Sequence, residues 1–204
     1  MCCSAGSYGP AMVPAQGEVP GYHRIMIFVI LIAVLLVIAI VIFNRLIRQR
    51  NRVENAWAQV DVQLKRRYDL IPNLVETVKG YASHERQTFE DVVVARTAAQ
   101  SATGVEPQAE AEGVLGSALR RLFALAEQYP ELRASENFQS LQTELAAAEN
   151  KIAVARQIYN DTVLTYNNSI QTVPTNVIAV LARFDARTYF EVENDARSTP
   201  EVRF

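Results

Sequence analysis

The sequence predicts an all-α protein in which an N-terminal transmembrane helix continues into an antiparallel bundle of long helices. Residues 25–43 form an apolar run without charge, proline or glycine. Beyond it, apolar residues recur in two long arrays at alternating steps of three and four, which is the spacing of helices that pack along their length. No period-two alternation typical of strands interrupts these arrays.

Residues 1–24 form an N-terminal tail that we expect to be disordered, because glycine and proline recur in it. Cys2 and Cys3 are the only cysteines, so the rest of the chain has neither a disulfide framework nor a thiolate metal site. Nothing in the sequence assigns them a function, and lipidation or a mis-assigned start both stay open.

The apolar run at residues 25–43 is predicted to cross a membrane. At about 1.5 Å per residue, a helix of this length nearly spans a hydrocarbon core of roughly 30 Å. A cleaved signal peptide would have a shorter apolar region followed by small residues, whereas this run is followed by "NRLIRQRNR".

The distribution of arginines predicts the orientation in the membrane. Arg24 is the only basic Lys or Arg before the run, whereas Arg45, Arg48, Arg50 and Arg52 follow it closely. Since Lys and Arg mark the cytoplasmic side, we expect the N-terminus outside and the bundle in the cytoplasm. These four arginines are candidate contacts to membrane lipid, namely anionic head groups.

The first array is predicted to continue the membrane helix. Arg67 occupies a position where an apolar residue is due, with Tyr68 beside it, and Pro72 predicts a kink, with Asp69 able to cap a restarted helix. We expect a linker at residues 101–113, which contain Gly104 and Pro107. The apolar positions of the array are Val53, Trp57, Val60, Leu64, Ile71, Leu74, Val78 and Tyr81.

Three segments complete the predicted bundle, which covers residues 44–184. A short amphipathic helix spans residues 114–129, a second long array runs over residues 138–173, and a further helix spans 174–184. That last helix either lies on the lipid surface or a neighbouring subunit, or belongs to the bundle core; the core reading is preferred. Residues 185–204 are expected to be an irregular tail.

An antiparallel register between the two arrays can be proposed from the one place in each where the apolar spacing is interrupted, between Leu64 and Ile71 and between Ile152 and Tyr159. If Trp57 faces Tyr159 and Leu64 faces Ile152, Arg67 falls opposite Glu149. Such a pair inside the seam would specify register more than stability. We then expect the double exchange Arg67→Glu with Glu149→Arg to restore what either single change loses.

Three stretches carry a resemblance to a known family: "NRVENAWAQVDVQLKRRYDLIPNLVETVKGYASHE", "ENKIAVARQIYNDTVLTYNNSIQTVPTNVIA" and "YFEVENDARSTPEVRF". The chain resembles the LemA family of bacterial membrane proteins over residues 25–204. The resemblance implies a membrane helix in the bacterial inner membrane, a short outside N-terminus, an antiparallel helical bundle and no established catalytic activity. The N-terminal tail is longer than the family pattern.

The sequence offers little that would carry catalysis. His84 and Glu85 begin a zinc-protease motif, but Thr88 stands where the second histidine is required. The remaining carboxylates are scattered, and no glycine-rich phosphate loop follows. The net charge of −2 argues against nucleic-acid binding. We expect no enzyme activity, no metal site and no cofactor.

The preferred functional hypothesis is a membrane-anchored scaffold or adapter that acts through protein–protein contacts and self-associates as a homo-oligomer. The alternative is a regulatory subunit that presents its bundle to an unidentified protein partner, such as a membrane protease. Several polar residues beside the seam would satisfy buried hydrogen bonds or form a face for another subunit: Glu54, Asn55, Gln63, Asn73, Asn160, Asn167 and Asn168.

Overall fold

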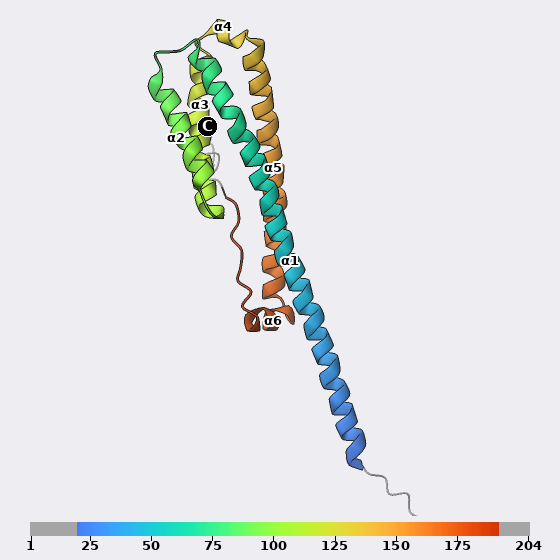
Figure 1. The fold of residues 1–204 in the computed structure, drawn as a ribbon. Coiled ribbons are helices and arrows are strands. Elements are labelled where there is room, and N and C mark those ends of the chain that lie inside the picture. The colour runs from blue at the N-terminus through green and yellow to red at the C-terminus, as the bar shows by residue number, and fades with distance from the viewer. Residues whose placement is uncertain (1–19, 192–204) are drawn as a thin grey trace, which may run out of the picture. The chain divides into compact units, whose positions relative to one another are not determined.

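The computed structural model describes residues 20–191, and every regular element in this range is an α-helix (Figure 1). The predicted all-α class is therefore confirmed. The chain divides into two compact units, Met1–Val41 and Ile42–Phe204. The expectations for residues 1–19 and 192–204 lie outside the described residues.

Helix α1, Pro20–Lys79, contains the apolar run. It begins earlier than the run itself, with Pro20 at its first position, where a missing N–H costs nothing. It is the one helix within residues 20–191 that is long and apolar enough to cross a membrane. Apart from Ala39 and Ile42, the side chains of the run are exposed, as expected for a helix whose partner is hydrocarbon.

Helix α1 runs through Pro72 and ends at Lys79. Because α1 is not interrupted at Pro72, Asp69 does not cap a new helix there. The chain then turns at Gly80, with the Ala82 amide bonded to the Val78 carbonyl, and continues as α2, Arg86–Ser101.

The predicted linker at residues 101–113 is wrong, because α3 spans Val105–Ala126. The break between α2 and α3 is confined to a few residues around Gly104, whose φ of 99° favours glycine. Pro107 lies in the first turn of α3, a position that proline tolerates. The signals taken for a linker are those of a helix start.

A short helix, α4 (Pro130–Arg133), leads into α5, Glu136–Gln171, and the chain ends its helical part with α6, Thr175–Leu181. Within the second unit, α5 runs antiparallel to α1, and α2 packs against α3 (Figure 1). The direction is fixed by two contacts: Gln49 bonds Ser169 at 2.9 Å, and the rings of Trp57 and Tyr159 are centred 5.4 Å apart.

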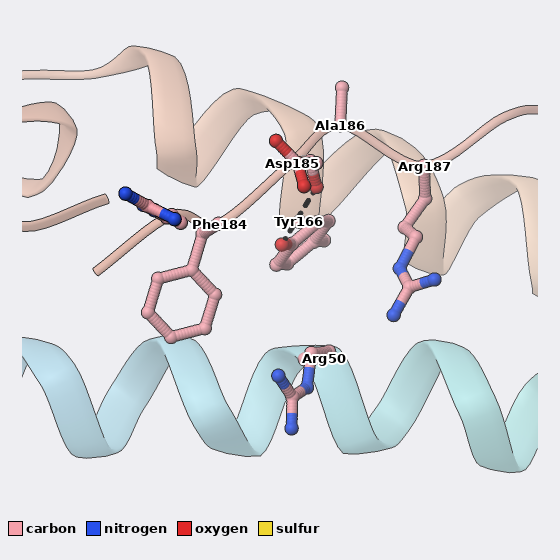
Figure 2. A pocket seen from close by; sticks show the side chains of 7 residues that line it. Arg50, Tyr166, Phe184, Asp185, Ala186 and Arg187 are labelled. Carbon is pink, nitrogen blue, oxygen red and sulfur yellow. Dashed lines mark hydrogen bonds between the residues drawn. The ribbon is translucent and has the colours of Figure 1, made fainter. Parts of the chain in front are cut away.

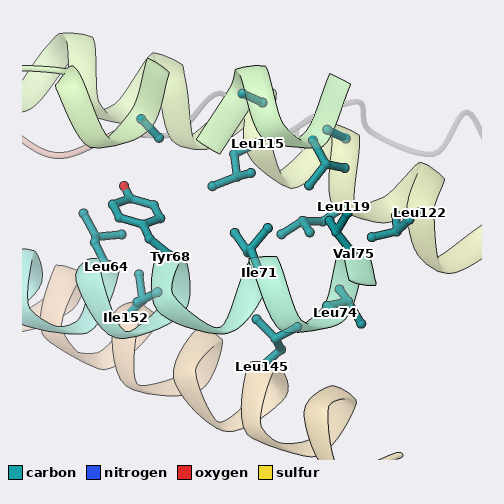
Figure 3. Close-up of a cluster of buried hydrophobic side chains, with 14 of the residues drawn as sticks. Leu64, Tyr68, Ile71, Leu74, Val75, Leu115, Leu119, Leu122, Leu145 and Ile152 are labelled. Carbon is teal, nitrogen blue, oxygen red and sulfur yellow. The ribbon is translucent and has the colours of Figure 1, made fainter. Parts of the chain in front are cut away.

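The core lies where α1, α3 and α5 meet. Figure 3 shows Leu64 and Ile71 of α1, Leu115 of α3, and Leu145 and Ile152 of α5 converging on it. Most predicted positions are buried, but Tyr81 and Val173 are 45% and 74% exposed, because each lies beyond the end of its helix.

Candidate functional site

A cluster of polar side chains, all but one of them buried, lies in the core, and we call it the Arg67 cluster. Arg67 and Tyr68 come from α1, Gln108 and Glu112 from α3, and Glu149 from α5. The Arg67 Nη1 lies 3.0 Å from a carboxylate oxygen of Glu112 and 3.0 Å from one of Glu149. The Tyr68 hydroxyl donates to the other oxygen of Glu112, and Gln108 Nε2 donates to the Tyr68 hydroxyl at 2.8 Å.

The structure brings Arg67 and Glu149 together, but the buried partner is Glu112. The Glu149 side chain is 54% exposed, whereas that of Glu112 is 5% exposed. The expectation of a two-residue pair enclosed in the seam is thus corrected to an arginine between one buried and one half-exposed carboxylate. Glu112 went unpredicted because it lay in the stretch interpreted as a linker.

Burial dominates the titration behaviour of the cluster. Burial raises the pKa of the Glu112 carboxyl, an effect that the Tyr68 hydroxyl and the Arg67 charge partly offset. Burial and the adjacent Glu112 also raise the pKa of Tyr68 well above its usual value, which keeps its hydroxyl a hydrogen-bond donor.

The cluster is arranged to hold helices together rather than to carry out proton transfer. A general acid or base must reach a substrate proton. Both oxygens of Glu112 already accept hydrogen bonds from within the bundle, and the residue is 6% exposed. Its donors come from α1 and α3, so the cluster joins α3 to the α1–α5 pair.

A second polar arrangement fixes the chain after α6. We call residues 185–191 the docked segment, and its backbone is bound by two Tyr–Asn pairs on α5, Tyr159–Asn160 and Tyr166–Asn167. The Tyr166 hydroxyl donates to the Asp185 carbonyl at 3.0 Å, and that of Tyr159 to the Thr188 carbonyl at 2.9 Å.

The two asparagines each make a double contact with the docked segment. Asn167 donates to the Arg187 carbonyl and accepts from the Arg187 amide, both at 2.9 Å. Asn160 does the same with Phe190, at 3.2 and 2.9 Å. Two of the seven polar seam residues, Asn160 and Asn167, thus make part-buried hydrogen bonds. Residues 185–191, which belong to the predicted irregular tail, have no regular secondary structure and are held against α5.

Near the end of the docked segment, the Phe190 ring packs between Trp57 of α1 and Arg156 of α5. Its ring is centred 5.7 Å from that of Trp57, and the Arg156 guanidinium lies 4.7 Å from the Phe190 ring centroid. Phe190 is 1% exposed, so it is as buried as any core residue. Partial burial lowers the pKa of Arg156, whose guanidinium lies over this ring.

A small cavity of about 160 Å³ lies beside the start of the docked segment (Figure 2). Arg50, Tyr166, Phe184 and Arg187 line it. Its positive charge is reduced by Glu54, one oxygen of which lies 3.7 Å from Arg50 and 3.4 Å from Arg187.

The four arginines predicted to meet the membrane do not share one environment. Arg45, Arg48 and Arg52 are exposed, and their spacing of three and four places them on one helix face. Arg50 is turned toward the bundle, with its guanidinium 6.0 Å from the Phe184 ring centroid.

The comparisons with known proteins agree with the sequence motifs. A sequence model described as LemA family matches residues 56–204. The chain belongs to the LemA family. That match includes the Arg67 cluster and both Tyr–Asn pairs.

Relatives of this LemA-family chain carry two kinds of name. Magnetosome protein MamQ 2 of Paramagnetospirillum magneticum is 26% identical over 207 residues, covering 88% of this chain and 76% of the relative. Protein LemA of Metamycoplasma hominis is 26% identical over 171 residues, covering 81% and 76%. Magnetosome protein MamQ of Magnetospirillum gryphiswaldense is 25% identical over 186 residues, covering 78% and 68%.

Proposed function

We propose that this chain is a membrane-anchored, non-catalytic scaffold whose bundle works through protein–protein contacts, first of all with further copies of itself. The observation that carries the proposal is an apolar groove of about 570 Å³ between α1 and α5. Val62 of α1 and Val154 and Ile158 of α5 line it, and they are 61%, 58% and 47% exposed. Exposed apolar surface gathered in this way marks an interaction site.

A second copy is the occupant that the groove suits best. Its lining is apolar or uncharged except for Lys151, so two grooves can meet with little charge repulsion. Related copies can pack the same patch on each other about a two-fold axis. Anchoring confines the copies to one plane and raises their effective concentration, which favours a weak contact of this kind.

The apolar run of α1 supports the membrane anchor, and the arginines that follow it support the orientation. Arg45, Arg48, Arg50 and Arg52 after the apolar run support a cytoplasmic bundle in the inner membrane, with the N-terminus outside. Cys2 and Cys3 precede the run and provide the test. A membrane-impermeant maleimide should label them in intact cells; labelling only after permeabilisation would reverse the proposed orientation.

Light scattering of the detergent-solubilised full chain tests self-association. We expect a discrete multimer, and we expect the double variant Val62→Asp with Val154→Asp to be monomeric. The matched control, Val94→Asp with Val114→Asp, changes two valines that are 68% and 57% exposed on α2 and α3, and it should keep the multimer. A monomeric native chain would contradict the proposal and favour a regulatory subunit that recruits a different protein.

A further inference from the structure

A patch of exposed aliphatic side chains lies on α6 and the turn before it. We call Val173, Val177, Val180 and Leu181 the α6 patch; they are 74%, 58%, 78% and 78% exposed. The last three have helical spacings of three and four, so they share one face of α6. Single exposed aliphatics are ordinary, but four within nine residues form a surface that needs an occupant.

The position of α6 along α1 indicates what that occupant is. The ring of Phe184, just after α6, packs edge-on against that of Phe43, with centroids 5.9 Å apart. Phe43 is the last residue of the uncharged run, and Arg45 follows it closely. The turn that carries the α6 patch is therefore beside the point where α1 passes from apolar to charged sequence, which is where a spanning helix leaves the hydrocarbon.

The charges around the α6 patch fit the same surface. No charged residue occurs between Asp161 and Arg183, so the end of α5 and all of α6 can approach lipid without burying a charge. Arg183 then follows α6, and Arg45 and Arg48 project from α1. Within residues 20–191, none of these three arginines forms an ion pair, in contrast to Arg50 and Arg187, which share Glu54.

We propose that the α6 patch inserts into the interfacial region of an anionic phospholipid bilayer, where α1 enters it. The aliphatic side chains reach the boundary of the acyl chains, as in interfacial amphipathic helices, while Arg45, Arg48 and Arg183 meet the phosphates. The bundle then has two attachments to the membrane, α1 and α6, and this inference depends on the anchoring proposed above.

Spin labels on the full chain in vesicles of phosphatidylcholine and phosphatidylglycerol test the contact. In a Cys2→Ser, Cys3→Ser background, a nitroxide at Val180→Cys should collide more often with oxygen, which concentrates in lipid, than with a water-soluble nickel chelate. Val94→Cys, on α2 with 68% exposure, is the matched control and should show the opposite preference. Ile32→Cys, inside the apolar run, supplies the lipid standard.

The possible outcomes separate this proposal from the anchor. A Val180 label that behaves as the Val94 label does, while the Ile32 label is in lipid, overturns the α6 contact alone. If the Ile32 label is also in water, both the proposed membrane anchor and the proposed α6 contact with lipid are contradicted. A Val180 label shielded from both reagents and broadened by a second label would assign the α6 patch to another copy and would also overturn the lipid contact.

A second variant checks the same point without labels. Val180→Asp with Leu181→Asp should leave the detergent-solubilised mass unchanged, because the groove between α1 and α5 is intact. In vesicles, the variant should expose the Arg183 peptide bond to added trypsin, and cleavage there should be at least several-fold faster than in the native chain. Equal cleavage rates at Arg183 would contradict the lipid contact.

Discussion

Asn167 and the backbone of Arg187 form a closed pair, in which the side-chain amide donates to the carbonyl and accepts from the amide, both at 2.9 Å. The two hydrogen bonds involve only main-chain atoms of Arg187. Asn160 makes the same two hydrogen bonds with the main chain of Phe190. A segment without regular secondary structure is thereby held against α5, and the backbone N–H and C=O of both Arg187 and Phe190 are satisfied.

Asn167→Asp should release the docked segment. A carboxylate cannot donate to the Arg187 carbonyl, and a buried group left without its partner costs about 1–3 kcal/mol. Amide exchange in residues 185–191 should become at least several-fold faster in the full chain. Asn168→Asp is the control, because Asn168 is the exposed neighbour on the same helix; if it accelerates exchange equally, the side-chain amide of Asn167 is not what holds the segment.

Phe190→Ala should shift the fluorescence emission of Trp57 to longer wavelength. Trp57 is the only tryptophan, and the Phe190 ring covers it at 5.7 Å, so its loss admits water to the indole. Tyr189→Ala, at a side chain that is 37% exposed, should leave the emission unchanged. Unchanged emission in both variants would mean that the docked segment does not cover Trp57 in solution.

Arg67→Met should destabilise the bundle far more than Glu149→Gln. The first change leaves the buried Glu112 carboxyl without its cation, at a cost of about 3–5 kcal/mol. The second removes a half-exposed partner, at a cost of about 0–1 kcal/mol. Denaturant unfolding in detergent, followed by Trp57 fluorescence, measures both; equal costs would contradict the dominant role of Glu112.

The double exchange of Arg67→Glu with Glu149→Arg should now fail to restore stability, contrary to the expectation from sequence. A glutamate at position 67 would face the Glu112 carboxylate, which lies 3.0 Å from the present guanidinium. Adding Glu112→Gln to the exchange should recover part of the loss, because it removes the repulsion. Full rescue by the double exchange alone would show that Glu112 contributes little.

Glu112 should also make stability depend on pH. Burial raises its pKa above 4.5, so the folded protein holds this proton more tightly than the unfolded chain does. Its contribution to the free energy of unfolding is then largest below that value and is lost as the pH rises through the folded-state pKa.

The stability of the native chain relative to Glu112→Gln should therefore decline as the pH rises above 4.5. The matched control is Glu110→Gln, an exposed glutamate on the same helix. Denaturant unfolding at several pH values makes the comparison. The same profile for both variants would show that burial of Glu112 has no effect on stability.

Sequence reasoning predicted the parts of the fold that depend on apolar spacing. The alternating steps of three and four correctly brought Trp57 to Tyr159, because a regular seam between two long helices leaves few registers. The same reasoning did not predict that Glu112 is buried, because a glutamate among alanines and a glycine is typical of a solvated stretch. Its burial depends on the packing of α3 against Arg67 of α1, which local sequence does not show. The docked segment was missed for a related reason. The Tyr–Asn repeat is visible on α5, but nothing local shows that its partner is an extended chain.

The seven-residue repeat of the Tyr–Asn pairs has a geometric consequence. Seven residues of helix advance about 10.5 Å, and three residues of extended chain advance about 10 Å. Helix and segment are thus commensurate, and Tyr166 and Tyr159 meet carbonyls three residues apart, at Asp185 and Thr188. Since these hydrogen bonds use only main-chain atoms of the docked segment, substitutions of Ala186, Thr188 or Tyr189 should leave them in place, whereas a change in the spacing from Asn160 to Asn167 should not.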